Sequence, residues 1–287
     1  TLFVDENTFP QVIDLLKTRS APIGVTLQIG CIDKLDITNP DLFAVYLQNP
    51  DNNGAIKDYT AFIETAHEKD VFVVMGADLM SLVLMKSPGE MGADVVVGNS
   101  QRFGVPMGFG GPHAAFFATK DEFKRQIPGR IIGISIDAAG NPGYRMALQT
   151  REQHIRREKA TSNICTAQVL LSVMASMYAV YHGPEGLKKI AGRIHGLAQL
   201  LESGLAKLGI KQVNAHYFDT LKLAVADKNA IKQKAEAAGI NFRYFTDNHV
   251  GISVDETTSL ADINAILSAF GGTPAEDQTK VVKLPAS

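Results

Sequence analysis

Several features that place a protein in a special class are missing from this chain of 287 residues. It has only two cysteines, Cys31 and Cys165, which are too few for a disulfide framework or a cysteine metal site and which suit a reducing compartment. Its formal net charge is −2, from 28 Lys and Arg against 30 Asp and Glu. This balance gives no reason to expect nucleic acid as a partner.

Neither a membrane span nor a signal peptide is visible in this sequence. The longest apolar stretch, residues 164–181, is interrupted by four polar residues: Thr166, Gln168, Ser172 and Ser176. We therefore predict a buried helix there and no membrane association. No basic segment precedes an apolar one at the N-terminus, which begins without Met and reads as a strand already under way. We expect the chain to be a piece of a longer protein.

What the chain does have is an alternation of strand-like and helix-like segments. Its composition, 45% hydrophobic and 20% charged, is that of a globular protein. Strand-like runs lie at residues 2–4, 23–29, 43–47, 71–75, 95–97 and 114–118, and helical patterns lie at 59–69 and 79–85. Strands that alternate with helices predict right-handed crossovers and a mostly parallel sheet.

The second part of the chain has a different pattern. Residues 121–163 carry turn signals and then a densely charged run, 149–163, for which a solvated face is the plain explanation. A long helix is predicted from Thr166, with Gly183-Pro184 ending it and starting a second helix that runs to residue 208. Later segments predict a compact α/β module, with strands at 221–225, 241–245 and 251–254 and helices at 230–238 and 260–270.

A loop with four glycines and two prolines, residues 104–112, connects the strand-like runs at 95–97 and 114–118. In α/β proteins, a polar loop at the end of a buried strand commonly holds a ligand. The alternative is a tight turn with no ligand, and spacing alone favours it, because the loop matches neither the dinucleotide fingerprint nor the P-loop.

Four longer segments, residues 98–113, 128–133, 148–166 and 177–187, resemble the P-protein family of the glycine cleavage system, the decarboxylating glycine dehydrogenases. The resemblance implies an α/β fold of the fold-type-I pyridoxal-phosphate class. In that class a large domain with a mostly parallel seven-stranded sheet precedes a small C-terminal α/β domain. We expect the large domain at residues 1–188, the small domain at 189–272 and a tail or linker at 273–287.

The resemblance also implies a reaction and a setting. Family members decarboxylate glycine and pass the remaining aminomethyl group to a lipoyl carrier protein. Their pyridoxal phosphate is held by a lysine as a Schiff base and takes up the electrons left by CO2. Full-length members have two related halves, and this chain resembles most of the N-terminal half. No metal is implied, and the location is the cytoplasm in a bacterium or the mitochondrial matrix in a eukaryote.

Two positions depart from the catalytic half of the family. That half carries its lysine in a His-Lys-Thr-Phe run and its pyridine carboxylate in an Asp-Gly-Ala-Asn run. Here Gln101 stands in the lysine slot and Met75 in the carboxylate slot, with Asp78 as a conceivable substitute for the acid. We predict that this chain does not hold the cofactor covalently, has no catalytic residue and is inactive alone. Arg102 and Lys86 are expected to be ordinary surface or salt-bridged residues.

The segment before the long helix is the candidate contribution of this half. Fold-type-I enzymes build their sites at a dimer interface, so Thr161, Ser162 and Asn163 are candidates for binding the cofactor phosphate of the other half. The alternative is that they only cap the helix. Candidates for lining the substrate site are His113, His154 and Arg157, against plain hydrogen-bonded or salt-bridged roles. Cys165 is by default an inert thiol, and a redox role is the alternative.

Three roles remain open for the chain as a whole. It completes the active site of the catalytic half, or it is a scaffold that only stabilises that half, or it acts alone as a transaminase-like enzyme, which the missing lysine opposes. The expected partners are the catalytic half and the lipoyl carrier protein. The helix at 166–181 and the glycine-rich loop lie on the expected interface, so the isolated chain exposes an apolar patch and can form a homodimer.

Overall fold

The computed structural model describes residues 1–127, 131–148, 157–159 and 166–272. Its first sheet has six strands in the order β2-β1-β3-β4-β5-β6, all parallel to their neighbours except β6, which is antiparallel to β5. The strands are β1 (Leu2–Asp5), β2 (Leu27–Gly30), β3 (Ala44–Asn49), β4 (Phe72–Ala77), β5 (Val95–Asn99) and β6 (Ala115–Thr119). The predicted mostly parallel sheet is confirmed, with six of the seven strands that the resemblance implies among the described residues.

The apolar runs of the sequence become the interior of this sheet. All six residues of β3 are buried, as expected for a parallel strand covered on both faces. Helix α2 (Thr60–His67) is confirmed and packs Ile63 and Ala66 against the core. The helix predicted at 79–85 is only a 3₁₀ turn, Ser81–Val83, although the Asp78 carboxylate accepts from the backbone N–H groups of Met80 and Ser81 as a helix N-cap does.

Two helices complete this part of the chain. Helix α1 (Pro10–Ser20) is not predicted from the sequence pattern, although Pro10 at its first position is a helix-start signal. The short α3 (Pro88–Met91) has a capping box formed by Ser87 and Glu90.

The longest helix, α5 (Thr166–Lys207), contains one break. Gly183 has φ 61° and ψ 179°, and Pro184 follows it, so the predicted change from one helix to another is confirmed. The prediction of a buried helix is wrong for the part before the break. Six of its large apolar side chains are 46–85% exposed, namely those of Val169, Leu170, Val173, Met177, Val180 and Tyr181. We call these six residues the α5 face; they are exposed because no described part of this chain covers them.

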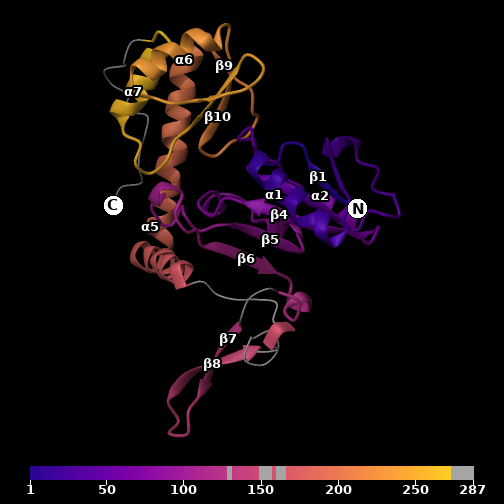
Figure 1. The fold of residues 1–287 in the computed structure, drawn as a ribbon. Coiled ribbons are helices and arrows are strands. Elements are labelled where there is room, and N and C mark those ends of the chain that lie inside the picture. The colour runs from indigo at the N-terminus through magenta and orange to yellow at the C-terminus, as the bar shows by residue number, and fades with distance from the viewer. Residues whose placement is uncertain (128–130, 149–156, 160–165, 273–287) are drawn as a thin grey trace.

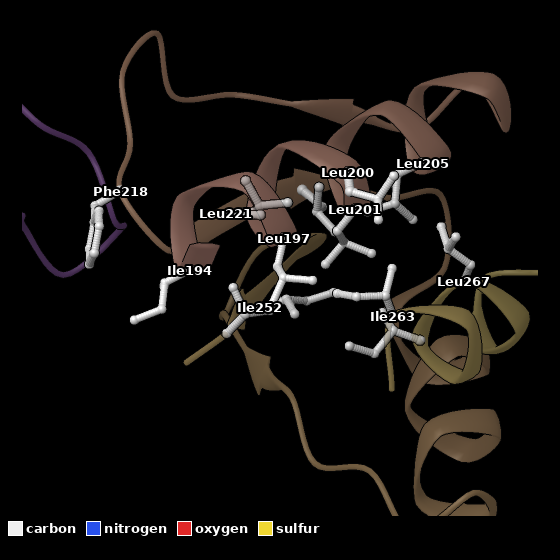
Figure 2. Close-up of a cluster of buried hydrophobic side chains, with 14 of the residues drawn as sticks. Ile194, Leu197, Leu200, Leu201, Leu205, Phe218, Leu221, Ile252, Ile263 and Leu267 are labelled. Atoms are coloured by element: carbon white, nitrogen blue, oxygen red, sulfur yellow. The ribbon is translucent and has the colours of Figure 1, made fainter. Parts of the chain in front are cut away.

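The part of α5 after the break belongs to a second core. It packs Ile194, Leu197, Leu201 and Leu205 against an antiparallel sheet of order β11-β12-β10-β9 and against α7 (Leu260–Ala269), as Figure 2 shows. The strands are β9 (Lys211–Gln212), β10 (Thr220–Ala224), β11 (Arg243–Tyr244) and β12 (His249–Ser253), and α6 (Lys228–Ala237) lies between β10 and β11 in the chain. The predicted α/β module is confirmed, and Ser259 caps α7 together with Asp262.

A third, two-stranded sheet stands apart from the other two. Strands β7 (Ile131–Ile136) and β8 (Pro142–Leu148) form an antiparallel hairpin that extends away from both cores (Figure 1). We call this hairpin the arm.

The expected domain boundary at residue 188 falls inside α5, shortly after the bend at Gly183. It stays a prediction, and the expected tail at 273–287 lies outside the described residues.

Candidate functional site

The residue in the carboxylate slot lies deep in the first sheet. Met75 is on β4, where its Cα partners are Leu47 on β3 and Val96 on β5, and its side chain is fully buried. A thioether there packs with the apolar core and cannot hold a pyridine nitrogen in its protonated form. The candidate substitute, Asp78, is the first residue after β4.

The backbone next to these positions is closely packed. A Cβ atom on Gly76 would lie 2.3 Å from both Gln48 Oε1 and Tyr46 Oη, and one on Gly98 would lie 2.4 Å from the carbonyl oxygen of Ala77. Tyr46 donates a hydrogen bond to Gln48 Oε1 over 3.4 Å, and burial raises the pKa of its hydroxyl to about 12. The ends of β4 and β5 are therefore filled by this chain's own atoms.

The residue in the lysine slot sits in the turn that follows β5. Gln101 donates its backbone N–H to Asn99 Oδ1 over 2.7 Å and accepts at its carbonyl from the N–H of Val105 over 3.1 Å. Ser100 fixes the other side of the turn by donating from its hydroxyl to the carbonyl of Ala114 over 3.0 Å. The position is well held, but its side chain is an amide, which cannot act as the nucleophile that a Schiff base needs.

Arg102 connects the two cores at this point. Its Nη1 lies 3.3 Å from Asp78 Oδ2 and 2.7 Å from Asp219 Oδ2, and its guanidinium lies 5.8 Å from the ring centre of Phe218. Burial raises the pKa of Asp78, and the negative charge of Asp219 adds to this, while Arg102 lowers it. Burial lowers the pKa of Arg102, but the two carboxylates outweigh this and raise it.

This arrangement settles the roles expected for two residues. The salt-bridged interpretation of Arg102 is confirmed, and Asp78 is its partner. Lys86 is salt-bridged as well, 3.6 Å from Asp58 Oδ2, and it donates to Thr60 Oγ1 over 2.6 Å. Neither Arg102 nor Lys86 occupies the position of the Schiff-base lysine. Asp78, the candidate for the pyridine carboxylate, is already paired with Arg102.

The second sheet closes over the loop that follows β3. Asn214 donates to the carbonyl of Asn53 over 2.7 Å, Lys222 donates to Asn53 Oδ1 over 3.0 Å, and Arg243 donates to the carbonyl of Asn52 over 2.8 Å. Gly54, with φ +80°, comes so close to Thr220 that a Cβ atom would lie 2.5 Å from its carbonyl oxygen. The carboxyl edge of the first sheet, where α/β proteins usually bind ligands, is thus held against the second sheet.

A pocket of about 410 Å³ does open elsewhere, beside α2. Its lining residues are Ile32, Asp33, Leu35, Ile37, Lys57, Asp58, Tyr59, Phe62 and Thr65. Neither of the two slot residues lines it. The residues in the lysine and carboxylate slots therefore do not fit a covalently held pyridoxal phosphate, in their chemistry or in their packing.

The glycine-rich loop packs against the first part of α5. Gly104 has φ +73°, and a Cβ atom on it would lie 2.6 Å from the ring of Tyr178, so both its backbone conformation and its contact require glycine. Phe103 stacks on Tyr178 with ring centres 5.6 Å apart. Beyond this contact Met107 and Phe109 point into solvent. The loop and the part of α5 before Gly183 are therefore neighbours.

The candidate contributors to a neighbouring site are only partly visible. His113 is exposed at the end of the glycine-rich loop, just before β6, and Arg157 is exposed with φ 52°. The others lie outside the described residues: Thr161, Ser162, Asn163, His154 and Cys165. Their proposed contacts stay predictions.

One residue of the site is not predicted from the sequence, namely Asp219. It is 117 positions from Arg102 and follows Phe218 in a segment with no motif. No local pattern indicates that pair. Among the described residues, no group of three or more His, Cys, Asp or Glu could hold a metal ion. None of the described helices combines the length and apolarity that a membrane span requires.

Comparison with known proteins gives concordant results. The family model described as glycine cleavage system P-protein matches residues 1–270. The chain is 54% identical to the glycine dehydrogenase (decarboxylating) of Stenotrophomonas maltophilia strain R551-3, over 100% of this chain and 30% of that protein. It is also 54% identical to the protein of the same name from Nostoc punctiforme, over 93% of this chain and 28% of the relative. The chain thus spans about 30% of the length of such relatives.

Solved structures agree on the fold. A glycine decarboxylase (P-protein) of the glycine cleavage system, in an inhibitor-bound form, matches with a TM-score of 0.81 and 32% identity, over 98% of this chain and 65% of that chain. A NifS-like protein from Rickettsia africae matches with a TM-score of 0.63 and 14% identity, over 94% of this chain and 74% of that chain, which shows likeness of fold alone. The predicted fold-type-I class is confirmed.

Proposed function

Because the chain belongs to the glycine cleavage system P-protein family, we propose that it is the lysine-free half of a decarboxylating glycine dehydrogenase. The complete enzyme decarboxylates glycine and passes the aminomethyl group to a lipoyl carrier protein, and its pyridoxal phosphate is bound by the other half. The two named relatives are bacterial, which supports a cytoplasmic location. The boundaries proposed for the two domains stay at residues 1–188 and 189–272.

One observation carries the assignment of this half. The lysine slot holds an amide, Gln101, and the carboxylate slot holds a fully buried thioether, Met75. The nearest acid, Asp78, is paired with Arg102. A half built in this way has no amine in the lysine slot and no carboxylate in the pyridine slot, which supports the proposal that it is inactive alone.

We propose that this half completes the active site of the other. Thr161, Ser162 and Asn163 lie three to five positions before Thr166, the first residue of α5. Free N–H groups and hydroxyls at a helix N-terminus suit a phosphate, so these residues are proposed to bind the cofactor phosphate across the interface. His113, His154 and Arg157 are proposed to line the substrate site, and the exposure of His113 and Arg157 is compatible with this.

The α5 face is the proposed meeting surface with the catalytic half. Its six large apolar side chains and the neighbouring glycine-rich loop are exposed in this chain. Soluble monomers rarely leave such a contiguous surface uncovered. In the absence of the catalytic half, we propose that the same surface pairs two copies of this chain.

A scaffold role is the second candidate, and the connection between the two cores favours it. Arg102 and the contacts of Asn52 and Asn53 hold the second sheet on the first. A rigid half of this kind can stabilise a partner without touching its cofactor.

Replacing Thr161 and Asn163 by Ala in the full-length enzyme separates the two candidates. A loss of glycine decarboxylation with normal assembly supports the proposal that this half completes the active site. If these residues bind the cofactor phosphate, the Kd for pyridoxal phosphate should rise in the same variant. A loss of assembly, or normal turnover with normal assembly, supports the scaffold. Ser172→Ala, an exposed change on α5, is the matched control.

A further inference from the structure

The arm is a hairpin that lacks the support a sheet usually has. Strands β7 and β8 pair only with each other among the described residues, and they extend away from both cores (Figure 1). An isolated two-stranded hairpin is only marginally stable in water, and it becomes stable when one face packs against something else. The arm therefore requires a surface to pack on.

One face of the arm is built for such a surface. Residues directly opposite each other on paired strands point to the same face, and here Ile134 lies opposite Tyr144 and Ile136 lies opposite Pro142. Ile132 follows the same alternation on β7. Four large side chains of this face, those of Ile132, Ile134, Ile136 and Tyr144, are 55–83% exposed, and the half-buried Met146, opposite Ile132, completes the face.

The other face of the arm has a different character. Along the regular part of the hairpin its opposed pairs are Gly133 with Arg145 and Ser135 with Gly143, which are small or polar, and the apolar pair Ile131 with Leu148 lies beyond the register irregularity at Ile131 and Ile132. The charged side chain is thus kept off the apolar face. This asymmetry fits a hairpin that is covered on one side and solvated on the other.

The tip of the arm is organised by its own residues. The Asp137 carboxylate accepts from the backbone N–H groups of Ala139 and Asn141, each over 2.8 Å, and Gly140 takes φ +85° to close the turn. These hydrogen bonds, with that from Asn141 N–H the strongest, hold the pKa of Asp137 below its usual value. The turn therefore helps to keep the two strands in register.

We propose that the apolar face of the arm packs on the part of the full-length polypeptide that this chain does not span, an inference that rests on the proposed function. The chain spans about 30% of its relatives, so most of the polypeptide lies outside it. A covalently connected partner is present at an effective concentration in about the millimolar range, which favours it over a second free copy.

The area available agrees with a stable contact. The arm and the α5 face together offer ten large apolar side chains that are about half exposed or more. At on the order of 100 Å² each, they supply about 1,000 Å², against about 800 Å² per partner in a standard interface. The face carries no charge, so the matching surface of the partner is apolar.

Amide hydrogen exchange tests the arm in the full-length enzyme and in the 287-residue chain. We expect exchange in β7 and β8 to be at least about tenfold slower in the full-length enzyme, because docking protects a hairpin that opens easily when alone. Ile134→Asp should remove this protection. Ser135→Asp places the same charge on the adjacent residue and the opposite face, and it should leave the protection in place.

Two results overturn the inference. Equal exchange rates in the two proteins would show that the arm is not docked. Protection that appears in the 287-residue chain and grows with its concentration would show that a second copy covers the arm. Glycine decarboxylation by the unmodified full-length enzyme tests the proposed function separately, so an active enzyme with an unprotected arm removes only the arm proposal.

Discussion

The parts of α5 before and after Gly183 each carry an apolar stripe, but the two stripes have different surroundings. After the bend, Ile194, Leu197, Leu201 and Leu205 are buried under the second sheet and α7 (Figure 2). Before it, the α5 face is exposed over its whole length. The comparison teaches that an apolar stripe shows that a helix needs cover, but not which polypeptide segment provides it.

The bend itself explains why one helix has two environments. Gly183 leaves the helical conformation with φ 61°, and Pro184 begins the next segment in a new direction. Only the later segment can then follow the second sheet. The earlier segment stays beside the glycine-rich loop, where Tyr178 packs on Gly104 and Phe103.

The largest expected effect comes from truncating one leucine on each side of the bend. Leu201→Ala removes a fully buried side chain from the second core and should lower the free energy of unfolding by about 2–5 kcal/mol. Leu170→Ala removes one that is 63% exposed and should change it by less than about 0.5 kcal/mol. Urea unfolding of the isolated chain measures both. Similar losses would show that the α5 face is covered within this chain.

The next effect concerns Arg102, the charged link between the two cores. Arg102→Met leaves Asp78 and Asp219 without their shared cation, and breaking such a pair costs about 3 kcal/mol, a value at the lower end of the usual range because Arg102 is partly exposed. Lys86→Met, which breaks an exposed pair with Asp58, should have little effect and is the control. An equal response of the two variants in urea unfolding would contradict a structural role for the Arg102 link.

The strands of the first sheet and the link between the two cores differ in how far the sequence predicts them. Continuous apolar runs predict β3, β4 and β5, because a strand buried on both faces needs apolar residues throughout. The link from Arg102 to Asp219 spans 117 positions and depends on how the two sheets meet. No periodicity encodes such a contact. From the sequence we expect Arg102 to be salt-bridged, but only the fold shows which carboxylates are its partners.

The resemblance predicts the slots but not their packing. Gln101 and Met75 are read directly from aligned motifs, whereas the full burial of Met75 follows from its neighbours on β3 and β5. The burial predicted for residues 164–181 is wrong for the six residues of the α5 face, which no described part of this chain covers. The arm is missed because Asn141-Pro142-Gly143 is interpreted as a turn signal, whereas Pro142 and Gly143 begin β8 and the turn comes just before them, at residues 137–141.

Self-association of the isolated chain tests whether the exposed part of α5 can form an interface. We expect the isolated chain to show a concentration-dependent dimer in analytical ultracentrifugation, since the α5 face is uncovered. Val180→Asp should weaken that dimer by about tenfold or more, because it places a charge in a desolvated contact.

Leu15→Asp is the control, since it makes the same kind of change at an exposed apolar residue of α1. The interface is wrongly assigned if the unmodified chain stays a monomer at its highest soluble concentration and does not shift when the catalytic half is added.

A smaller effect is expected from Asp5, at the end of β1. This carboxylate is buried, and its Oδ2 has no hydrogen-bond partner. Burial raises its pKa above the ordinary 3.8, opposed by the backbone N–H of Asn7. Between the unfolded and the folded pKa the folded state binds more protons, so stability falls as the pH rises through this window.

Asp5→Asn removes that titration. The stability of the variant relative to the unmodified chain should therefore increase as the pH rises from below 3.8 through the raised pKa, and should be constant above it. Urea unfolding at several pH values measures the difference. Asp14→Asn, which removes an exposed carboxylate from α1, controls for the lost charge. A difference that does not vary with pH would show that Asp5 titrates as it does in the unfolded chain.

The smallest expected effect is that of placing a lysine at position 101, which should produce no glycine decarboxylation. Gln101→Lys supplies a nucleophile, but Met75 still occupies the carboxylate slot, and Asp78 remains paired with Arg102. Without a carboxylate to keep the pyridine nitrogen protonated, the cofactor is a weak electron sink. Neither this variant nor the unmodified chain should decarboxylate glycine with pyridoxal phosphate above a buffer control. Turnover by the variant well above that control, or a visible band that borohydride fixes to one residue of the unmodified chain, would show that the packed end of the first sheet still accepts the cofactor.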